Sequence, residues 1–247
     1  MKTKTGILLA LLLLAHAAGA AEQGFSGVEL RVGAGSNPNG LTLPLQILVL
    51  LTLLTLLPAL VLSVTSFTRI IIVTHFLRQA LGTQTMPPNQ VLIGLSLFLT
   101  FFIMQPVGDR INQEAVQPML QGQLTEMEAL ERAGTPMREF MLRYTREKDL
   151  LLFINIARLP RPASSQALPL RVVIPSFMIS ELKTAFQIGF AVFIPFLIID
   201  MVVASVLLAM GMMQLPPVVI STPLKILLFV MVDGWNLVVG SVVRSFF

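Results

Sequence analysis

The chain has 247 residues, of which 55% are hydrophobic and only 12% are charged, with a net charge of +4 and no cysteine. Ordinary globular domains carry about 25% charged residues, so this composition excludes most soluble folds. No basic stripe interleaved with aromatic residues occurs, which argues against a nucleic-acid-binding surface. Without cysteine, a disulfide framework and a thiolate metal site are both excluded. Most charges lie between residues 109 and 171, so we expect the flanking apolar segments to enter a membrane.

The N-terminus has the pattern of a secretory signal peptide. Lys2 and Lys4 precede a short apolar run, and Ala18-Gly19-Ala20 offers the small residues that signal peptidase requires. We predict a signal peptide over residues 1–21 and a flexible periplasmic leader over residues 22–40. The alternative is an uncleaved first membrane helix, but the apolar run is shorter than the ~20 residues that a span needs.

Four long apolar blocks follow, at residues 41–64 (continued at 70–81), 91–104, 186–210 and 218–243. Inside hydrocarbon the backbone must satisfy its own hydrogen bonds, so each block is expected to be helical. The predicted fold is an all-α membrane protein with a first helical hairpin at 41–107, a polar periplasmic region at 108–171 and a second hairpin at 172–247. With the N-terminus outside, Arg69 and Arg78 fall near the cytoplasmic end of the first pair, as the positive-inside rule prefers.

The polar region has its own helical pattern between residues 124 and 152. Apolar residues recur at helical spacing there, and charged residues occupy the opposite face. Gly134-Thr135-Pro136 predicts a break between two surface helices, with Thr135 as N-cap and Pro136 in the first turn. The Pro- and Ser-rich residues 159–169 are expected to form a linker.

An internal repeat joins the helices of each predicted hairpin. Ala80-x-Gly82, followed by Pro87 and Pro88, matches Ala209-x-Gly211, followed by Pro216 and Pro217. Each glycine is expected to end a helix in a left-handed conformation, and each proline pair to start the next helix. Such repeats are typical of transporters. The alternative is that glycine and paired prolines simply make good turns.

Two charges interrupt the second hairpin, Asp200 and Lys225. At ~1.5 Å per residue they lie about 15 and 12 Å from the hairpin tip, at similar depths in an antiparallel pair. Charges in an apolar setting should be paired or face a water-filled path. We therefore predict that they meet, within one hairpin or between neighbouring copies; the alternative to a transport role is a locking ion pair.

Several other polar residues are candidates for interfaces with other helices. They are Arg69, Glu181, Lys183, Asp233 and Trp235. His75 lies alone in an apolar run and is expected to be packed or paired rather than a metal ligand. No phosphate-binding, metalloprotease or nucleophile-elbow motif occurs. The sequence therefore predicts no enzymatic activity, no metal and no cofactor.

Long strings of residues resemble the FliP/SctR family of type III secretion export-gate subunits. They are TSFTRIII (65–72), QALGTQTMPPNQVLIGLSLFLTFF (79–102), SELKTAFQIG (180–189), GMMQLPP (211–217) and VMVDGWNLVVG (230–240). Virulence-type injectisome homologues are also similar, and the signal peptide favours the flagellar branch. The resemblance covers about 200 residues, from Leu41 to the C-terminus.

The resemblance implies a homo-oligomer of several copies with FliQ and FliR, in a gate that conducts unfolded flagellar proteins across the inner membrane. FlhA and FlhB would be neighbours and FliO an assembly factor, at the flagellar basal body, with much of the gate raised toward the periplasm. A methionine-rich pore gasket would map to Met210, Met212 and Met213, with Gln214 in place of a third consecutive methionine.

Two competing functions remain beside the export gate. One is a small-solute or ion transporter, suggested by the repeat and the membrane charges. The other is an assembly scaffold that lines no pore.

Overall fold

The structure is a computed structural model, and it describes residues 43–83, 85–160, 168–212 and 214–247. All regular elements in these ranges are helices, which confirms the all-α prediction for the described residues. The chain divides into two compact units, residues 1–54 and 55–247, and each is considered by itself. The predicted signal peptide and leader lie outside the described residues.

Helix α2 (Leu43–Val64) begins in the first unit and continues into the second. Its segment Ile47–Val64 is long and apolar enough to cross a membrane. Two of its hydroxyls bond within the helix: Thr52 donates to the Leu48 carbonyl at 2.7 Å and Ser63 to the Ala59 carbonyl at 2.6 Å. Such a bond to the carbonyl four residues earlier satisfies a hydroxyl that would otherwise lack a hydrogen-bond partner in an apolar environment.

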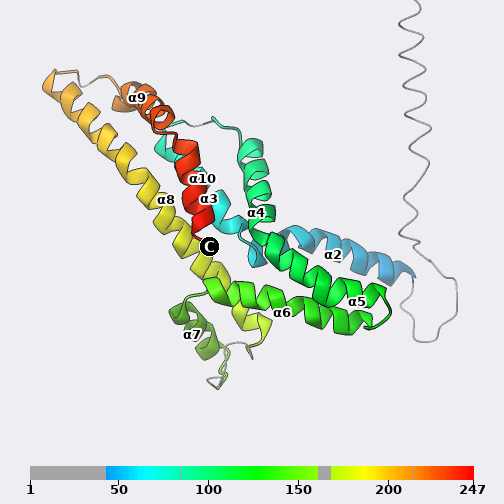
Figure 1. The fold of residues 1–247 in the computed structure, drawn as a ribbon. Helices are drawn as coiled ribbons and strands as arrows, with labels where there is room; N and C mark the ends of the chain where they lie inside the picture. The colour runs from blue at the N-terminus through cyan, green and yellow to red at the C-terminus, as the bar shows by residue number, and fades with distance from the viewer. Residues whose placement is uncertain (1–42, 84, 161–167, 213) are drawn as a thin grey trace, which may run out of the picture. The chain divides into compact units, whose positions relative to one another are not determined.

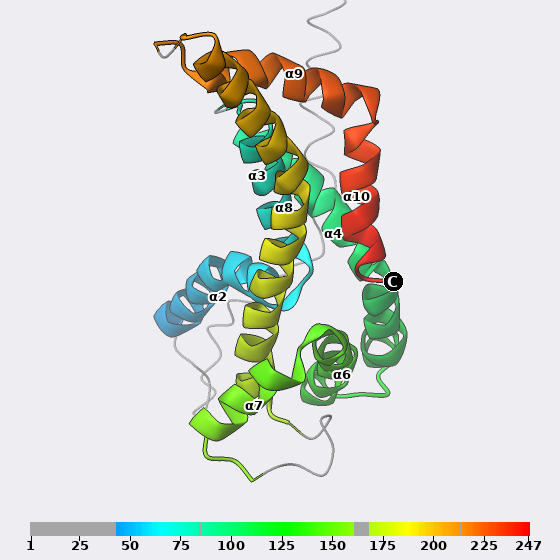
Figure 2. The same cartoon turned by 90° about the vertical axis from the view of Figure 1, so that its left-hand side faces the viewer.

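Three helices form the centre of the second unit: α3 (Phe67–Ala80), α4 (Asn89–Ile111) and α8 (Leu170–Ala209). Helix α3 packs on both α8 and α4, and it lies between them (Figures 1 and 2). Its buried residues recur at helical spacing: Ile70, Val73, Leu77 and Ala80. The central helix therefore buries apolar side chains against its two neighbours.

Helices α3 and α8 run parallel to each other. Arg69 on α3 pairs with Glu181 on α8, and about two turns farther along both helices Phe76 meets Gly189. A Cβ atom at Gly189 would lie 2.7 Å from the Phe76 ring, so this glycine permits the close approach of the two helices. Consequently both hairpin tips point toward the same end of the unit.

The polar region differs from its prediction. Helix α4 continues through a π-helical turn, Asn112–Val116, into α5 (Gln117–Leu120), and is followed by α6 (Glu126–Tyr144) and α7 (Glu147–Ile156). The predicted break at Gly134-Thr135-Pro136 is wrong, because α6 runs through Pro136 and ends at Tyr144.

The N-terminus of α6 lies at a different N-cap from the predicted one. Thr125 accepts from the Glu128 N–H, and the Glu128 carboxylate accepts from the Thr125 N–H at 2.9 Å. This capping box starts the helix ten residues before Thr135. A proline inside a helix removes one backbone hydrogen bond, and burial of Pro136 and Phe140 in the core offsets that loss.

The first helix of the second hairpin extends well before the apolar block at 186–210. Helix α8 has 40 residues and starts at Leu170, two residues before the hairpin start predicted at residue 172. The first part of α8 does not belong to the apolar block because it carries charged residues, but it is continuous with the rest of the helix. These residues are Arg171, Glu181 and Lys183.

The last two helices meet at a sharp bend. Helix α9 (Pro217–Met231) and α10 (Gly234–Arg244) make an angle of 68° at Asp233, which has a φ of 52°. Among the described residues, three helical segments are long and apolar enough to span a membrane, and α9 with α10 would make a fourth.

Candidate functional site: hairpin tips and buried charges

The tip of the second hairpin presents methionine side chains at the end of α8. Gly211 has a φ of 75°, its N–H donates to Leu208, and the Met212 N–H donates to Leu207. This is the Schellman arrangement, which closes the helix C-terminus, and α9 then starts at Pro217. Met210 is 67% exposed and Met212 is 41% exposed, and Gln214 is also exposed, while Met213 lies outside the described residues.

The first tip repeats this geometry. Gly82 also has a φ of 75°, and its N–H donates to Gln79 at 3.0 Å. The Thr83 hydroxyl replaces a backbone donor by bonding to the Arg78 carbonyl at 3.3 Å. Pro88 is the N-cap of α4, after a cis bond between Met86 and Pro87. The predicted left-handed conformation of both glycines is thus confirmed.

The structure brings Asp200 and Lys225 together within one hairpin. Lys225 Nζ lies 2.6 Å from Asp200 Oδ2, and the Ser221 hydroxyl donates to Asp200 Oδ1 at 2.6 Å. Ser221 and Lys225 are four residues apart and therefore share a face of α9. The Lys225 side chain is 3% exposed, whereas that of Asp200 is 29% exposed. The cation is thus buried while the carboxylate retains access to its surroundings.

The first tip lies directly against this charge pair. A Cβ atom at Gly82 would lie 2.7 Å from Thr222 Oγ1 and 3.8 Å from Lys225 Nζ. The C-terminus of α3 carries partial negative charge, which favours a nearby cation. The first tip and the charge pair therefore form one cluster, whereas a Cβ atom at Gly211 in the second tip would have no neighbour within 4 Å.

A second buried cluster surrounds Arg69. Its Nε donates to Glu181 Oε2 at 2.9 Å, and a second contact joins Nη2 to Oε1. Nη1 donates to the Ser245 carbonyl at 3.1 Å, and the guanidinium lies 3.8 Å from the centre of the Phe246 ring. Arg69 and Glu181 are buried inside the chain, so their place differs from the partner interface suggested by the sequence.

The other interface candidates remain on the surface. Lys183, Asp233 and Trp235 are exposed, and the Trp235 ring packs edge-on against Phe229 at 5.5 Å. His75 is exposed, with Nδ1 3.0 Å from Arg78 Nη2. No cluster of three or more metal-ligating side chains occurs among the described residues.

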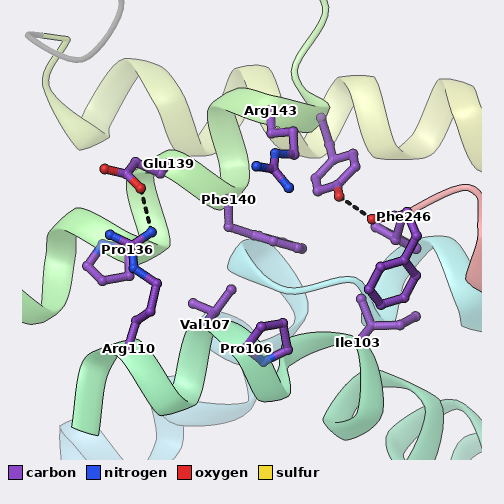
Figure 3. Close-up of a pocket in the computed structure, with 11 residues that line it drawn as sticks. Ile103, Pro106, Val107, Arg110, Pro136, Glu139, Phe140, Arg143 and Phe246 are labelled. Carbon is purple, nitrogen blue, oxygen red and sulfur yellow. Dashed lines mark hydrogen bonds and ion pairs between the residues drawn. The ribbon is translucent and has the colours of Figure 1, made fainter. Parts of the chain in front are cut away.

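A cavity of about 250 Å³ lies where α4, α6 and the C-terminus meet (Figure 3). Ile103, Pro106, Val107 and Phe140 line its apolar side. At the edge of the cavity, Arg110 Nη1 donates to Glu139 Oε2 at 2.6 Å. The Tyr144 hydroxyl donates to the Phe246 carbonyl. Both contacts hold α6 to its neighbours, and the cavity contains no arrangement suited to acid–base or nucleophilic chemistry.

The profile of the FliP family matches residues 50–242 of the chain. The chain belongs to the FliP family. It is 59% identical to the flagellar biosynthetic protein FliP of Pectobacterium carotovorum subsp. carotovorum, over 85% of this chain and 83% of that protein. The FliP protein of Bacillus subtilis is 54% identical over 88% of this chain and 98% of its own length. The FliP protein of Aquifex aeolicus is 48% identical over 96% of this chain and 98% of its own length.

Family membership confirms the resemblance found in the sequence. FliP proteins are non-enzymatic components of the export gate in the flagellar export apparatus, and this helical membrane chain is such a component. The two tips and the buried Asp200–Lys225 pair are therefore the candidate functional site.

Proposed function

We propose that several copies of this chain, together with FliQ and FliR, form a pore that conducts unfolded flagellar proteins across the bacterial inner membrane. FliO would assist assembly, and FlhA and FlhB would adjoin the gate at the flagellar basal body. The observation that carries the proposal is the second tip, where the exposed side chains of Met210 and Met212 lie at the C-terminal end of α8.

Methionine suits a seal that must yield to many different chains. Its side chain is flexible and apolar, so it fills irregular gaps and adapts to varied surfaces. A ring of second tips would close an empty pore with Met210, Met212 and Met213, beside Gln214. The buried Asp200–Lys225 pair below would keep the two helices of each tip in register.

Helix length supports placing much of the gate toward the periplasm. A helix of 40 residues is about 60 Å long, twice the thickness of the ~30 Å hydrocarbon core. Its exposed apolar side chains extend from Ile179 to Leu208, too far for lipid alone to cover. Part of α8 would therefore pack on protein outside the bilayer.

The test measures ion leak through the assembled gate with Met210→Ala and Met212→Ala. Shorter side chains should leave the pore open and raise leak several-fold, and a stalled unfolded export substrate should block that leak. The matched control is Met127→Ala, since Met127 is 75% exposed but lies on α6. Unchanged leak in the tip variant would contradict the gasket, and leak that a stalled substrate does not block would favour a small-solute transporter.

A further inference from the structure

One exposed face of α8 carries a charge followed by an amide and phenyl rings. Lys183, Phe186, Gln187 and Phe190 lie at helical spacing and, with Phe76, line a shallow groove. Both α8 phenylalanines in it are more than half exposed. Gln187 accepts from Arg146, which fixes its side chain, while Lys183 has no hydrogen-bond or ion-pair partner among the described residues.

An exposed face of α4 carries the opposite charge. Phe101, Phe102, Gln105 and Asp109 line a second shallow groove, and both rings are more than half exposed. Within the described part of the chain Asp109 has no partner, although its neighbour Arg110 pairs with Glu114 and Glu139. Each face therefore has one charge that the described residues leave unneutralised.

The two faces cannot meet within one chain. Helix α3 packs against both α4 and α8, which lie on either side of it (Figures 1 and 2). Lipid is a poor cover for them, because an unpaired Asp or Lys in hydrocarbon is costly. A partner that supplies the opposite charge beside apolar surface satisfies both faces.

The order of residues along the two faces matches. Helix α8 runs toward its tip and α4 runs away from its tip, so both are compared in the direction of the tips. In that direction α8 presents Lys183, Gln187 and Phe190, and α4 presents Asp109, Gln105 and Phe101. Two copies placed side by side with tips aligned would set charge on charge, amide on amide and ring on ring.

We infer that the α4 face of one copy docks on the α8 face of the next, with Asp109 opposite Lys183. The contact is head to tail, since it joins two different faces, and such contacts close into rings when the rotation allows. It rests on the proposal that the gate contains several copies, and it assigns the surface through which they associate.

The test uses the natural absence of cysteine. Chains carrying both Asp109→Cys and Lys183→Cys, assembled in membranes and treated with a short bismaleimide, should give a ladder of dimers and larger species. A mixture of the two single-cysteine chains should stop at dimers, because each copy then has one reactive face. Glu131→Cys with Lys183→Cys is the matched control, since Glu131 is an exposed acid on α6, and it should give no ladder.

Charge reversal tests the pairing itself. In membranes, each charge reversal alone, Asp109→Lys or Lys183→Asp, should lower the association of the variant chain with a tagged copy about tenfold. The double reversal should restore that association. Export of an unfolded reporter is measured in the same cells. Export without a cysteine ladder, or a double reversal that fails to restore association, would overturn the docking surface and leave the gate standing. Absence of export and of leak even in the unsubstituted assembled chain would instead contradict the proposed function.

Discussion

Among the residues that the structure describes, two cations are almost completely buried, and each pairs with one carboxylate. Arg69 is 2% exposed and pairs with Glu181, and Lys225 is 2% exposed and pairs with Asp200. The cost of removing two charges from water offsets much of their attraction, so an intact pair adds little stability. Breaking a pair is different, because it leaves one charge buried without compensation.

Unequal burial of Asp200 and Lys225 predicts unequal effects of substitution. Asp200→Asn leaves a buried ammonium group without its carboxylate and should destabilise the fold by about 3–5 kcal/mol. Lys225→Met leaves a carboxylate that still accepts from Ser221 and is partly exposed, so we expect a loss of about 1–3 kcal/mol. Thermal unfolding of the purified protein in detergent measures both.

The double variant and a surface pair are the controls. Asp200→Asn with Lys225→Met removes both charges and should be more stable than Asp200→Asn alone. Glu139→Gln breaks the exposed pair with Arg110 and should change stability by about 1 kcal/mol or less. Equal losses of stability in the two single variants would contradict this prediction, because they would show that partial exposure of the Asp200 carboxylate does not lower the cost of leaving it unpaired.

Sequence reasoning brought Asp200 close to Lys225 because both belong to one hairpin with a short tip. Counting residues from the tip is enough to compare depths in such a hairpin. The pairing of Arg69 with Glu181 joins residues 112 positions apart. It depends on the register of two parallel helices that are not adjacent in sequence, and no local spacing encodes that register.

At the scale of elements, local chemistry predicted the tips well and the polar region less well. Gly82 and Gly211 each follow an apolar run and precede a proline pair, where a left-handed glycine commonly ends a helix, so their role was evident from sequence. Pro136 is ambiguous, because proline both starts and interrupts helices. Tertiary burial of α6 decided the outcome there, and the competing signal was the Thr125–Glu128 capping box.

The two tip glycines have the same φ but different surroundings, which makes them a matched pair. Gly211→Ala adds a methyl group in open space and should cost only the left-handed strain, about 1–2 kcal/mol. Gly82→Ala carries the same strain and also forces the methyl group against Thr222. We expect an additional loss of about 1–3 kcal/mol in thermal unfolding.

Thr222→Ala should relieve that additional loss. The Thr222 hydroxyl bonds to the Val218 carbonyl in its own helix, so its removal alone should change little. If Gly82→Ala is no worse than Gly211→Ala, or if Thr222→Ala does not rescue it, the first tip does not press on α9.

At the scale of the whole second unit, the C-terminus holds the bent last helix in place. Ser245 accepts from Arg69 through its carbonyl and hydroxyl oxygens, and the Phe246 carbonyl accepts from Tyr144. Phe246 also stacks against Phe140, with ring centres 6.3 Å apart. These contacts join the end of α10 to α3 and α6.

Deletion of residues 245–247 should therefore release α10 while the tips stay folded. Amide hydrogen exchange should rise across Gly234–Arg244, the span of α10, and remain unchanged in the hairpin of α8 and α9. Tyr144→Phe removes a single hydrogen bond and should give a smaller rise, equivalent to about 1 kcal/mol. Phe247→Ala is the control, because Phe247 is 80% exposed and should tolerate the change. Faster exchange throughout α8 after the deletion would contradict this prediction. It would mean that the C-terminus supports the entire unit rather than one helix, because the Arg69–Glu181 pair would then depend on Ser245 for its stability.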